Sequence, residues 1–441
     1  AINSIKNSVV SAGAGSGKTT VLSERFLNLI QNHGASVDQI LTLTFTKKAT
    51  VEMSDRIYKV LKQKSPEQAA KFSKANIKTI DSYCAGIAKL SSRHFGISPD
   101  FVQDKNKIHD FAYSLALQTI LENRSHSAIK YLISTKNYDD IASQLFMPVL
   151  NNSTVISPLD FDSMIEKQLQ ELISVWNKNS KEIKKEFENA SENIVSYEES
   201  LTKDMPVTFK KIQDKYQSIG EFFTVELTKE KILSKKLEET EDFIMLLSKL
   251  SKFPLPGNLK GLETYKNSVI KFREKYELLV SVYNYAYYFD IVQDYFSLAK
   301  DFQQKITDFK RTAGILTFAD ISDLALKTLI EFPEIRQIEK EKYKFIMIDE
   351  FQDNNEMQKS MLFLLAENLS RTEKSVPKAA ELCPEKLFFV GDEKQSIYKF
   401  RGADVSVFRK LSGEFPDGNL NMSTNYRSHP ALISMFNTFF G

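Results

Sequence analysis

The sequence contains only two cysteines, Cys84 and Cys383, among 441 residues. Two distant cysteines exclude a disulfide framework and a cysteine-rich metal site, and they are typical of a reducing cytosol, so we expect a cytoplasmic protein. No apolar run reaches the length of a transmembrane helix and no signal peptide precedes the first motif, so we expect no membrane partner. Charge of one sign is also lacking, because 59 basic and 57 acidic side chains give a net charge of +2. Any basic surface for nucleic acid must therefore be local.

The remaining composition, 42% hydrophobic and 26% charged, is that of a globular protein long enough for two or three domains. Residues 1–95 and 311–441 alternate short apolar runs with helical periods, as a parallel sheet with crossover helices requires. Residues 96–310 instead carry Lys- and Glu-rich helical periods and almost no strand signal. We therefore predict an α/β domain with a parallel sheet, formed by the outer two segments and interrupted by a large all-helical insertion.

The stretch "VSAGAGSGKTT" (residues 10–20) joins a predicted strand, "NSVVSA", to a predicted helix, "TTVLSERFLNLI". Gly13, Gly15 and Gly17 leave backbone N–H groups free to converge on phosphate oxygens, and the start of the helix adds unpaired donors. Lys18 can reach the terminal phosphates and the Thr19 hydroxyl can ligate Mg²⁺. A glycine-rich turn that only caps the helix is the weaker alternative. The candidate nucleotide-binding residues are Ala12, Gly13, Ala14, Gly15, Ser16, Gly17, Lys18, Thr19 and Thr20.

A second candidate stretch, "FIMIDEFQD", is an apolar run that ends in two acids, Asp349 and Glu350. A buried strand would place both acids at its carboxyl end, where open α/β sheets bind ligands. Asp349 fits the carboxylate that holds Mg²⁺, and Glu350 is then placed to polarise the water that attacks the γ-phosphate. An acidic helix start after a buried strand is the alternative. The pair of acids favours hydrolysis over a kinase, for which we find no acceptor pocket.

Five stretches occur in a fixed order: "AGAGSGKTT", "TFTKKATVEMSDRI", "DEFQD", "GDEKQSIYKFRGAD" and "NYRSHP". This set resembles the UvrD/RecB-like superfamily 1 DNA helicases over residues 8–90 and 315–440. The runs "VSAGAGSGKTTVL" and "TIDSYC", and the roughly 270 residues between Thr79 and Asp349, are most similar to AddA/RecB-type helicase–nuclease subunits. The resemblance implies a RecA-like motor domain 1A with a helical insertion 1B. It also implies an ATP- and Mg²⁺-dependent translocase, moving 3′ to 5′ on single-stranded DNA in double-strand-break repair and recombination.

The resemblance also assigns roles to residues outside the first two stretches. Gln395 would sense the γ-phosphate, Arg427 would contact its charge, and Tyr426 would stack on adenine. The catalytic set is then Glu350, Lys18, Gln395 and Arg427. A base of the tracked strand would stack between Phe45 and the "IYKFRGAD" stretch. Taken alone, each ring is better explained by core packing, and only the motif context favours DNA stacking. The DNA-binding set is Phe45, Thr46, Lys48, Tyr398, Phe400 and Arg401.

The resemblance finally implies parts that this sequence does not contain. A second motor domain with its own motifs is expected after Gly441, so we read the chain as the N-terminal motor half of a longer protein. The chain alone should bind nucleotide but hydrolyse it poorly. The implied partners are single-stranded DNA, duplex ends and a second large subunit of an AddAB/RecBCD-like complex. A UvrD/Rep-type repair helicase and a nucleotide-gated DNA-binding module without turnover stay open as alternatives.

Overall fold

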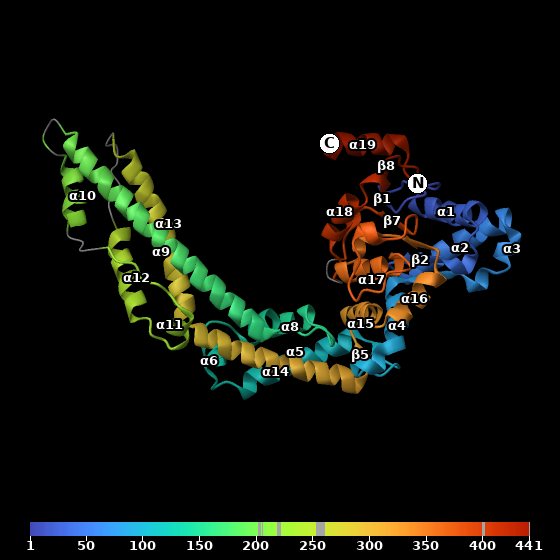
Figure 1. Ribbon diagram of the computed structural model, residues 1–441, viewed down its shortest axis with the longest axis horizontal. Helices are drawn as coiled ribbons and strands as arrows, with labels where there is room; N and C mark the ends of the chain where they lie inside the picture. The colour runs from blue at the N-terminus through green and yellow to red at the C-terminus, as the bar shows by residue number, and fades with distance from the viewer. Residues whose placement is uncertain (202–203, 205, 218–221, 253–260, 399–401, 441) are drawn as a thin grey trace. The chain divides into compact units, whose positions relative to one another are not determined.

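The computed structural model of the protein describes the whole chain except residues 202–203, 205, 218–221, 253–260, 399–401 and 441, and the side chains of 208, 215–217, 437 and 440. The chain forms two compact units (Figure 1). The first unit comprises residues 1–111, 154–158 and 306–441, and the second comprises 112–153 and 159–305. Each unit has hydrophobic core clusters of its own.

The first unit is built on a six-stranded sheet with the order β3-β2-β6-β7-β1-β8, in which every neighbouring pair is parallel. The predicted α/β class with a parallel sheet is thereby confirmed. A separate parallel pair joins β4 (Val102–Gln103) to β5 (Ile315–Leu316). The strands of the main sheet are β1 (Ser8–Ala12), β2 (Ile40–Thr44), β3 (Asn76–Thr79), β6 (Phe345–Ile348), β7 (Leu387–Gly391) and β8 (Asn419–Met422).

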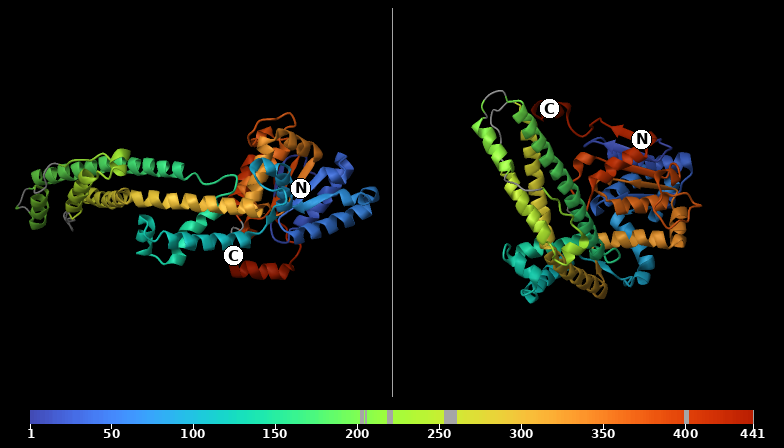
Figure 2. Two further views of the ribbon diagram at one scale, coloured as in Figure 1. Left: turned by 90° about the horizontal axis from the view of Figure 1, so that it is seen from below. Right: turned by 60° about the vertical axis from the view of Figure 1, so that its left-hand side comes forward.

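Helices cover both faces of this sheet, so successive residues of a strand enter different cores (Figure 2). In β7, Leu387 and Phe389 pack into one cluster, whereas Phe388 and Val390 pack into the other. Strands buried on both faces read as continuous apolar runs, which explains why "FIMI" and "LFFV" are visible in the sequence. One face carries α1 (Lys18–His33) and α2 (Lys47–Lys64), and the other carries α4 (Ile80–Ser91), α15 (Phe318–Glu331), α17 (Glu356–Ala366) and α18 (Val405–Glu414).

The second unit is helical in all its regular elements that the structure describes. Its two longest helices, α9 (Phe161–Glu199) and α13 (Glu263–Tyr287), lie side by side in Figure 1 and share one apolar core around Trp176. Ion pairs such as Lys275–Glu182 and Lys271–Glu186 link them along their length. The smaller helices are α6 (Ser127–Ile133), α7 (Tyr138–Ile141), α8 (Met147–Asn152), α10 (Val207–Gln217), α11 (Lys229–Leu233) and α12 (Glu238–Ser251).

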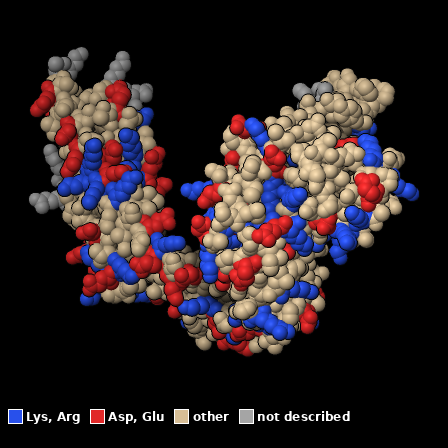
Figure 3. All heavy atoms as spheres, turned by 45° about the vertical axis from the view of Figure 1, so that its right-hand side comes forward, with Lys and Arg blue, Asp and Glu red and all other residues tan. Residues whose placement is uncertain are grey.

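The helices α5 (Lys105–Glu122) and α14 (Phe289–Ala313) each contribute residues to both units. The first unit also contains α3 (Pro66–Ala69), α16 (Pro333–Lys342) and α19 (Pro430–Phe440). No helix in the described part of the chain combines the length and apolarity needed to cross a membrane. Basic and acidic side chains are interspersed over the surface seen in Figure 3, as the near-zero net charge leads one to expect.

A buried ion pair fixes the start of α15 within the first unit. The Lys310 ammonium lies 2.8 Å from an Asp320 carboxylate oxygen, and both side chains are at most 2% exposed. Asp320 also accepts hydrogen bonds from the backbone N–H groups of Val155 and Thr317, at 2.8 Å each, and from the Thr317 hydroxyl. One carboxylate therefore gathers three separate segments of the chain.

Replacing this carboxylate should be costly. We expect Asp320→Ala to lower the free energy of unfolding by about 3–5 kcal/mol, because Lys310 would remain as a buried and unpaired charge. Urea unfolding measures the change, with Asp417→Ala at an 86% exposed side chain as the control, where about 0.5 kcal/mol or less is expected. An equal effect of the two substitutions would contradict this account of α15.

Candidate functional site

The five ordered motifs begin at or shortly after the carboxyl end of a strand in the main sheet. The glycine-rich loop follows β1, Phe45 follows β2, and Asp349 follows β6. Asp392 follows β7, and the stretch "NYRSHP" comes shortly after β8. Because all six strands are parallel, these segments lie together along one edge of the sheet, the one formed by the carboxyl ends of the strands. Fold topology thus brings together residues from five widely separated parts of the sequence.

The glycine-rich loop has the backbone conformation that its composition predicts. Gly15 and Gly17 have φ angles of 75° and 85°, in the left-handed region that favours glycine. Gly17 precedes the first residue of α1, Lys18, so the loop ends at the N-terminus of a 16-residue helix. The Ser16 hydroxyl is buried without a hydrogen-bond partner. Loop and helix therefore present donors to an anion.

An ion pair joins the end of this loop to the segment that follows β6, the strand two positions from β1 in the sheet. The Lys18 ammonium donates to Glu350 Oε2 at 3.0 Å across 332 residues of sequence. The Lys18 side chain is only 11% exposed and that of Glu350 is 32% exposed, so the ion pair is partly shielded from solvent. Glu350 is also a non-glycine residue in the left-handed region, with φ 51° and ψ 44°. Such strain of about 1–3 kcal/mol is typical of functional sites.

Asp349 is a deeply buried acid of the site. Its side chain is 6% exposed, and one of its oxygens accepts a hydrogen bond from the Glu350 backbone N–H at 3.0 Å. Burial and then repulsion by Glu350 raise the pKa of Asp349 to about 7, against the opposing effect of Lys18. The same two causes raise the pKa of Asp353 to about 6. A cation bound nearby would therefore stabilise the charged form of both acids.

Gln352 is a site residue that reasoning from the sequence missed. Its amide nitrogen donates to Glu350 Oε2 at 2.8 Å, and its amide oxygen accepts from the Asp392 N–H at 2.8 Å. The Gln395 amide in turn donates to the Asp392 carboxylate. The spacing within "DEFQD" could not reveal this link, because its other end is 40 residues further along the chain.

The "NYRSHP" segment lies against the glycine-rich loop. The Tyr426 N–H donates to the Gly15 carbonyl at 2.9 Å, and a Cβ on Gly15 would lie 2.9 Å from the Cβ of Arg427. Gly15 is thus required by close approach as well as by its φ angle. Tyr426 is 78% exposed.

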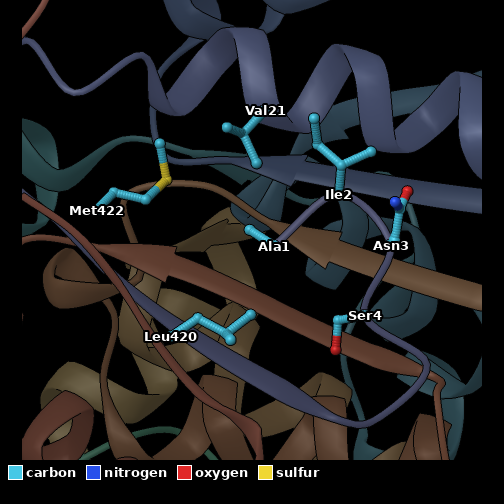
Figure 4. Close-up of a pocket in the computed structure, with 7 residues that line it drawn as sticks. All are labelled: Ala1, Ile2, Asn3, Ser4, Val21, Leu420 and Met422. Carbon is cyan, nitrogen blue, oxygen red and sulfur yellow. The ribbon is translucent and has the colours of Figure 1, made fainter. Parts of the chain in front are cut away.

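An open, mostly apolar pocket of about 480 Å³ lies beside the loop, between α1 and the edge strand β8 (Figure 4). Its lining includes Val21, three residues after Lys18, and Met422, whose carbonyl accepts a hydrogen bond from the Gly13 N–H at 3.3 Å. The remaining lining residues are Ala1, Ile2, Asn3, Ser4 and Leu420.

Two of the predicted DNA-binding residues contact each other. The rings of Phe45 and Tyr398 have centroids 4.8 Å apart, and Phe45 is only 8% exposed. The Thr46 hydroxyl accepts a hydrogen bond from the Ala49 N–H and caps α2, while the Lys48 side chain is 87% exposed. Phe400 and Arg401 lie outside the described residues.

Comparison with known proteins agrees with this geometry. The family model of the UvrD/REP helicase N-terminal domain matches residues 1–416. The chain belongs to the UvrD/REP helicase family. This confirms the family that the five motifs indicated.

Several curated relatives of this UvrD/REP helicase chain are named as the AddA subunit of an ATP-dependent helicase/nuclease. The one from Streptococcus pyogenes serotype M1 is 25% identical and matches 99% of the chain. The relative from Streptococcus suis is 27% identical over 99% of the chain, and that from Streptococcus agalactiae serotype Ia is 26% identical over 98%. The chain spans only 37–38% of the length of these relatives. Their shared name agrees with the predicted resemblance to AddA-type proteins.

The raised pKa of Asp349 gives a testable dependence of stability on pH. The folded-state pKa of about 7 exceeds the ordinary pKa of 3.8. Asp349 therefore costs no stability below about pH 4, and the free energy of unfolding falls as the pH rises from about 4 to 7. Asp349→Asn should therefore raise the free energy of unfolding by on the order of 3 kcal/mol at pH 8 and hardly at all at pH 4.

Urea unfolding at the two pH values, without nucleotide or divalent cation, measures this difference. Asp417→Asn, at an exposed site, serves as the control. A gain from Asp349→Asn that is equal at pH 4 and pH 8 would show that Asp349 is not destabilised by its charge.

Proposed function

We propose that this chain is the ATP-binding motor half of a DNA translocase, the N-terminal part of an AddA-like helicase–nuclease protein. The observation that carries the proposal is the contact between Lys18 and Glu350. It sets the loop suited to phosphates and the acid suited to water activation against the same space. Family membership and the name shared by the relatives support the DNA-directed part of the proposal.

In the proposed site, backbone N–H groups of residues 12–20 and the Lys18 ammonium bind the phosphates of ATP. No cluster of three or more metal-binding side chains occurs among the described residues, so this part of the chain offers no cage for a divalent cation. Mg²⁺ fits this situation, because it takes few protein oxygens and completes its shell with phosphates and water. Thr19 and Asp349 would hold it, and it would neutralise charge on the phosphates.

Glu350 is the proposed general base. With ATP bound, Lys18 turns to the phosphates and frees the Glu350 carboxylate to accept a proton from the attacking water. Gln395 and Arg427 are proposed to approach the γ-phosphate from the ends of β7 and β8. Tyr426 is proposed to stack on the adenine, since its side chain is exposed and its backbone N–H donates a hydrogen bond to the Gly15 carbonyl in the loop.

The DNA strand is proposed to cross the same carboxyl-terminal edge of the sheet, over the segments that follow β2 and β7. Tyr398 offers its ring for stacking, backed by the buried ring of Phe45. Lys48 and the N-terminus of α2, capped by Thr46, are suited to backbone phosphates. Stacking serves a translocase because every base has a π-face and no sequence needs to be read. Phe400 and Arg401 complete the proposed set.

The proposal extends to the organisation of the whole protein. The two outer segments correspond to motor domain 1A and the helical unit to insertion 1B, with a second motor domain supplied beyond this chain. Movement from 3′ to 5′, pairing with a second large protein, action at duplex ends and a cytoplasmic location belong to the proposal as well. The chain alone is proposed to bind ATP but to turn it over slowly.

Two substitutions separate nucleotide binding from hydrolysis. Lys18→Ala should weaken ATP binding by about 10- to 100-fold, since charged hydrogen bonds contribute about 1.5–3 kcal/mol each. Glu350→Gln should leave binding within about threefold but lower DNA-stimulated hydrolysis by the full-length protein at least about 100-fold. Lys107→Ala, at an exposed position, is the control.

Fluorescent ATP binding to this chain and phosphate release by the full-length protein provide the two measurements. Unchanged hydrolysis after Glu350→Gln would rule out its role as base. Little phosphate release by the unmodified full-length protein, with ATP still bound and no change after Glu350→Gln, would favour a passive clamp.

Removing the less buried member of the ring pair, Tyr398, tests the DNA platform. Tyr398→Ala should weaken binding of single-stranded DNA by about 1–3 kcal/mol, to the same extent for oligo-dT and for mixed sequences. Fluorescence anisotropy measures the affinities. Tyr58→Ala is the matched control, because Tyr58 is 41% exposed and contacts another ring, Phe72, elsewhere on the same unit. Equal losses from both substitutions would argue against a platform at Tyr398.

A further inference from the structure

Gln352 lies between Glu350, in the proposed nucleotide site, and Asp392, in the segment that leads to Tyr398. The residue is 1% exposed. Its Oε1 accepts from the Asp392 N–H, which is a donor only, so the amide oxygen must face Asp392. Its Nε2 must then face Glu350, to which it donates at 2.8 Å. The orientation of the amide is fixed by its neighbours, and both of its ends are engaged.

The far end of this link belongs to the segment that leads to Tyr398. Asp392 accepts hydrogen bonds from the Lys394 N–H, at 3.1 Å, and from the Gln395 amide. The Ser396 hydroxyl donates to the backbone carbonyl of Gln352 at 3.2 Å. Gln352 therefore holds this segment at two points, once through its side chain and once through its main chain.

Tight packing prevents the link from moving by itself. A Cβ on Gly391 would lie 2.7 Å from Gln352 Oε1 and 3.1 Å from the Phe408 ring, so the side chain fills its space up to the backbone of β7. A shift of Glu350 must therefore either break the hydrogen bond or displace the 391–396 backbone.

The near end of the link shares its acceptor with Lys18. Both the Lys18 ammonium and the Gln352 amide donate to Oε2 of Glu350, at 3.0 and 2.8 Å. When phosphates take Lys18, Gln352 becomes the donor that still holds this oxygen. The hydrogen bond from Gln352 then helps to fix the Glu350 carboxylate, and a shift of that carboxylate acts in turn on Gln352.

We propose that Gln352 is a positioning residue that couples the state of the nucleotide site to the segment carrying Tyr398. The inference rests on the proposed function and adds to it a route for the coupling. In physical terms, the binding of an ATP analogue changes the affinity for single-stranded DNA through Gln352, and DNA changes the affinity for the analogue by the same factor.

Thermodynamic linkage tests this coupling without requiring hydrolysis. The affinity of this chain for oligo-dT is measured by anisotropy with and without saturating AMP-PNP and Mg²⁺. For the unmodified chain we expect AMP-PNP to change the affinity at least about fivefold. For Gln352→Met, which has nearly the same volume but no amide, we expect a change below about twofold, with AMP-PNP and DNA each still bound.

Gln337→Met is the matched control, since Gln337 lies on α16, away from the site, and its amide donates to Glu341 of the same helix. It should retain the full linkage. Thermal unfolding verifies that the variants fold. Should Gln352→Met not fold, Gln352→Glu replaces it: that side chain keeps the acceptor for Asp392 but sets a second carboxylate against Glu350, so linkage should again be lost.

The possible outcomes distinguish this inference from the proposed function. If the unmodified chain binds neither AMP-PNP nor DNA, the proposed function is wrong. If it binds both without linkage, or if a folded Gln352 variant keeps linkage of fivefold or more, the coupling role of Gln352 is wrong and the proposed function stands. Loss of linkage in the Gln352 variant alone supports the inference.

Discussion

The contact between Lys18 and Glu350 depends on one constraint, the parallel course of all six strands in the main sheet. Parallel strands place their carboxyl ends at one edge, so an amine after β1 and an acid after β6 meet although 332 residues separate them. A reversed strand would send its motif to the opposite edge. The helical unit can therefore be inserted in the sequence between β3 and β6 without disturbing the site, provided that the strand order is kept.

The same edge stores unfavourable energy that a ligand could release. Glu350 is held in the left-handed region, Asp349 is buried beside it, and the Ser16 hydroxyl has no partner. Each feature costs stability in the free protein. A cation would stabilise the charged form of Asp349, and a phosphate would accept a hydrogen bond from the Ser16 hydroxyl. The core clusters on both faces of the sheet offset these costs. Strain and desolvation at one place, surrounded by dense packing, are what a binding site requires.

The sequence predicted the central part of this arrangement and missed its periphery. The runs in β1, β6 and β7 were recognisable because strands buried on both faces are apolar throughout. Strand β8 was not predicted, because "NLNM" lies at a sheet edge and is partly exposed. Gln352 escaped notice because its role depends on a tertiary contact with Asp392, which no local pattern encodes.

A crystal structure of this chain with AMP-PNP and Mg²⁺ tests the central claim most directly. We expect the Lys18 ammonium to leave Glu350 and to lie within hydrogen-bonding distance of the β- or γ-phosphate. We also expect Asp349 and Thr19 to lie beside the cation. Nucleotide bound elsewhere, with the 3.0 Å contact between Lys18 and Glu350 preserved, would contradict it.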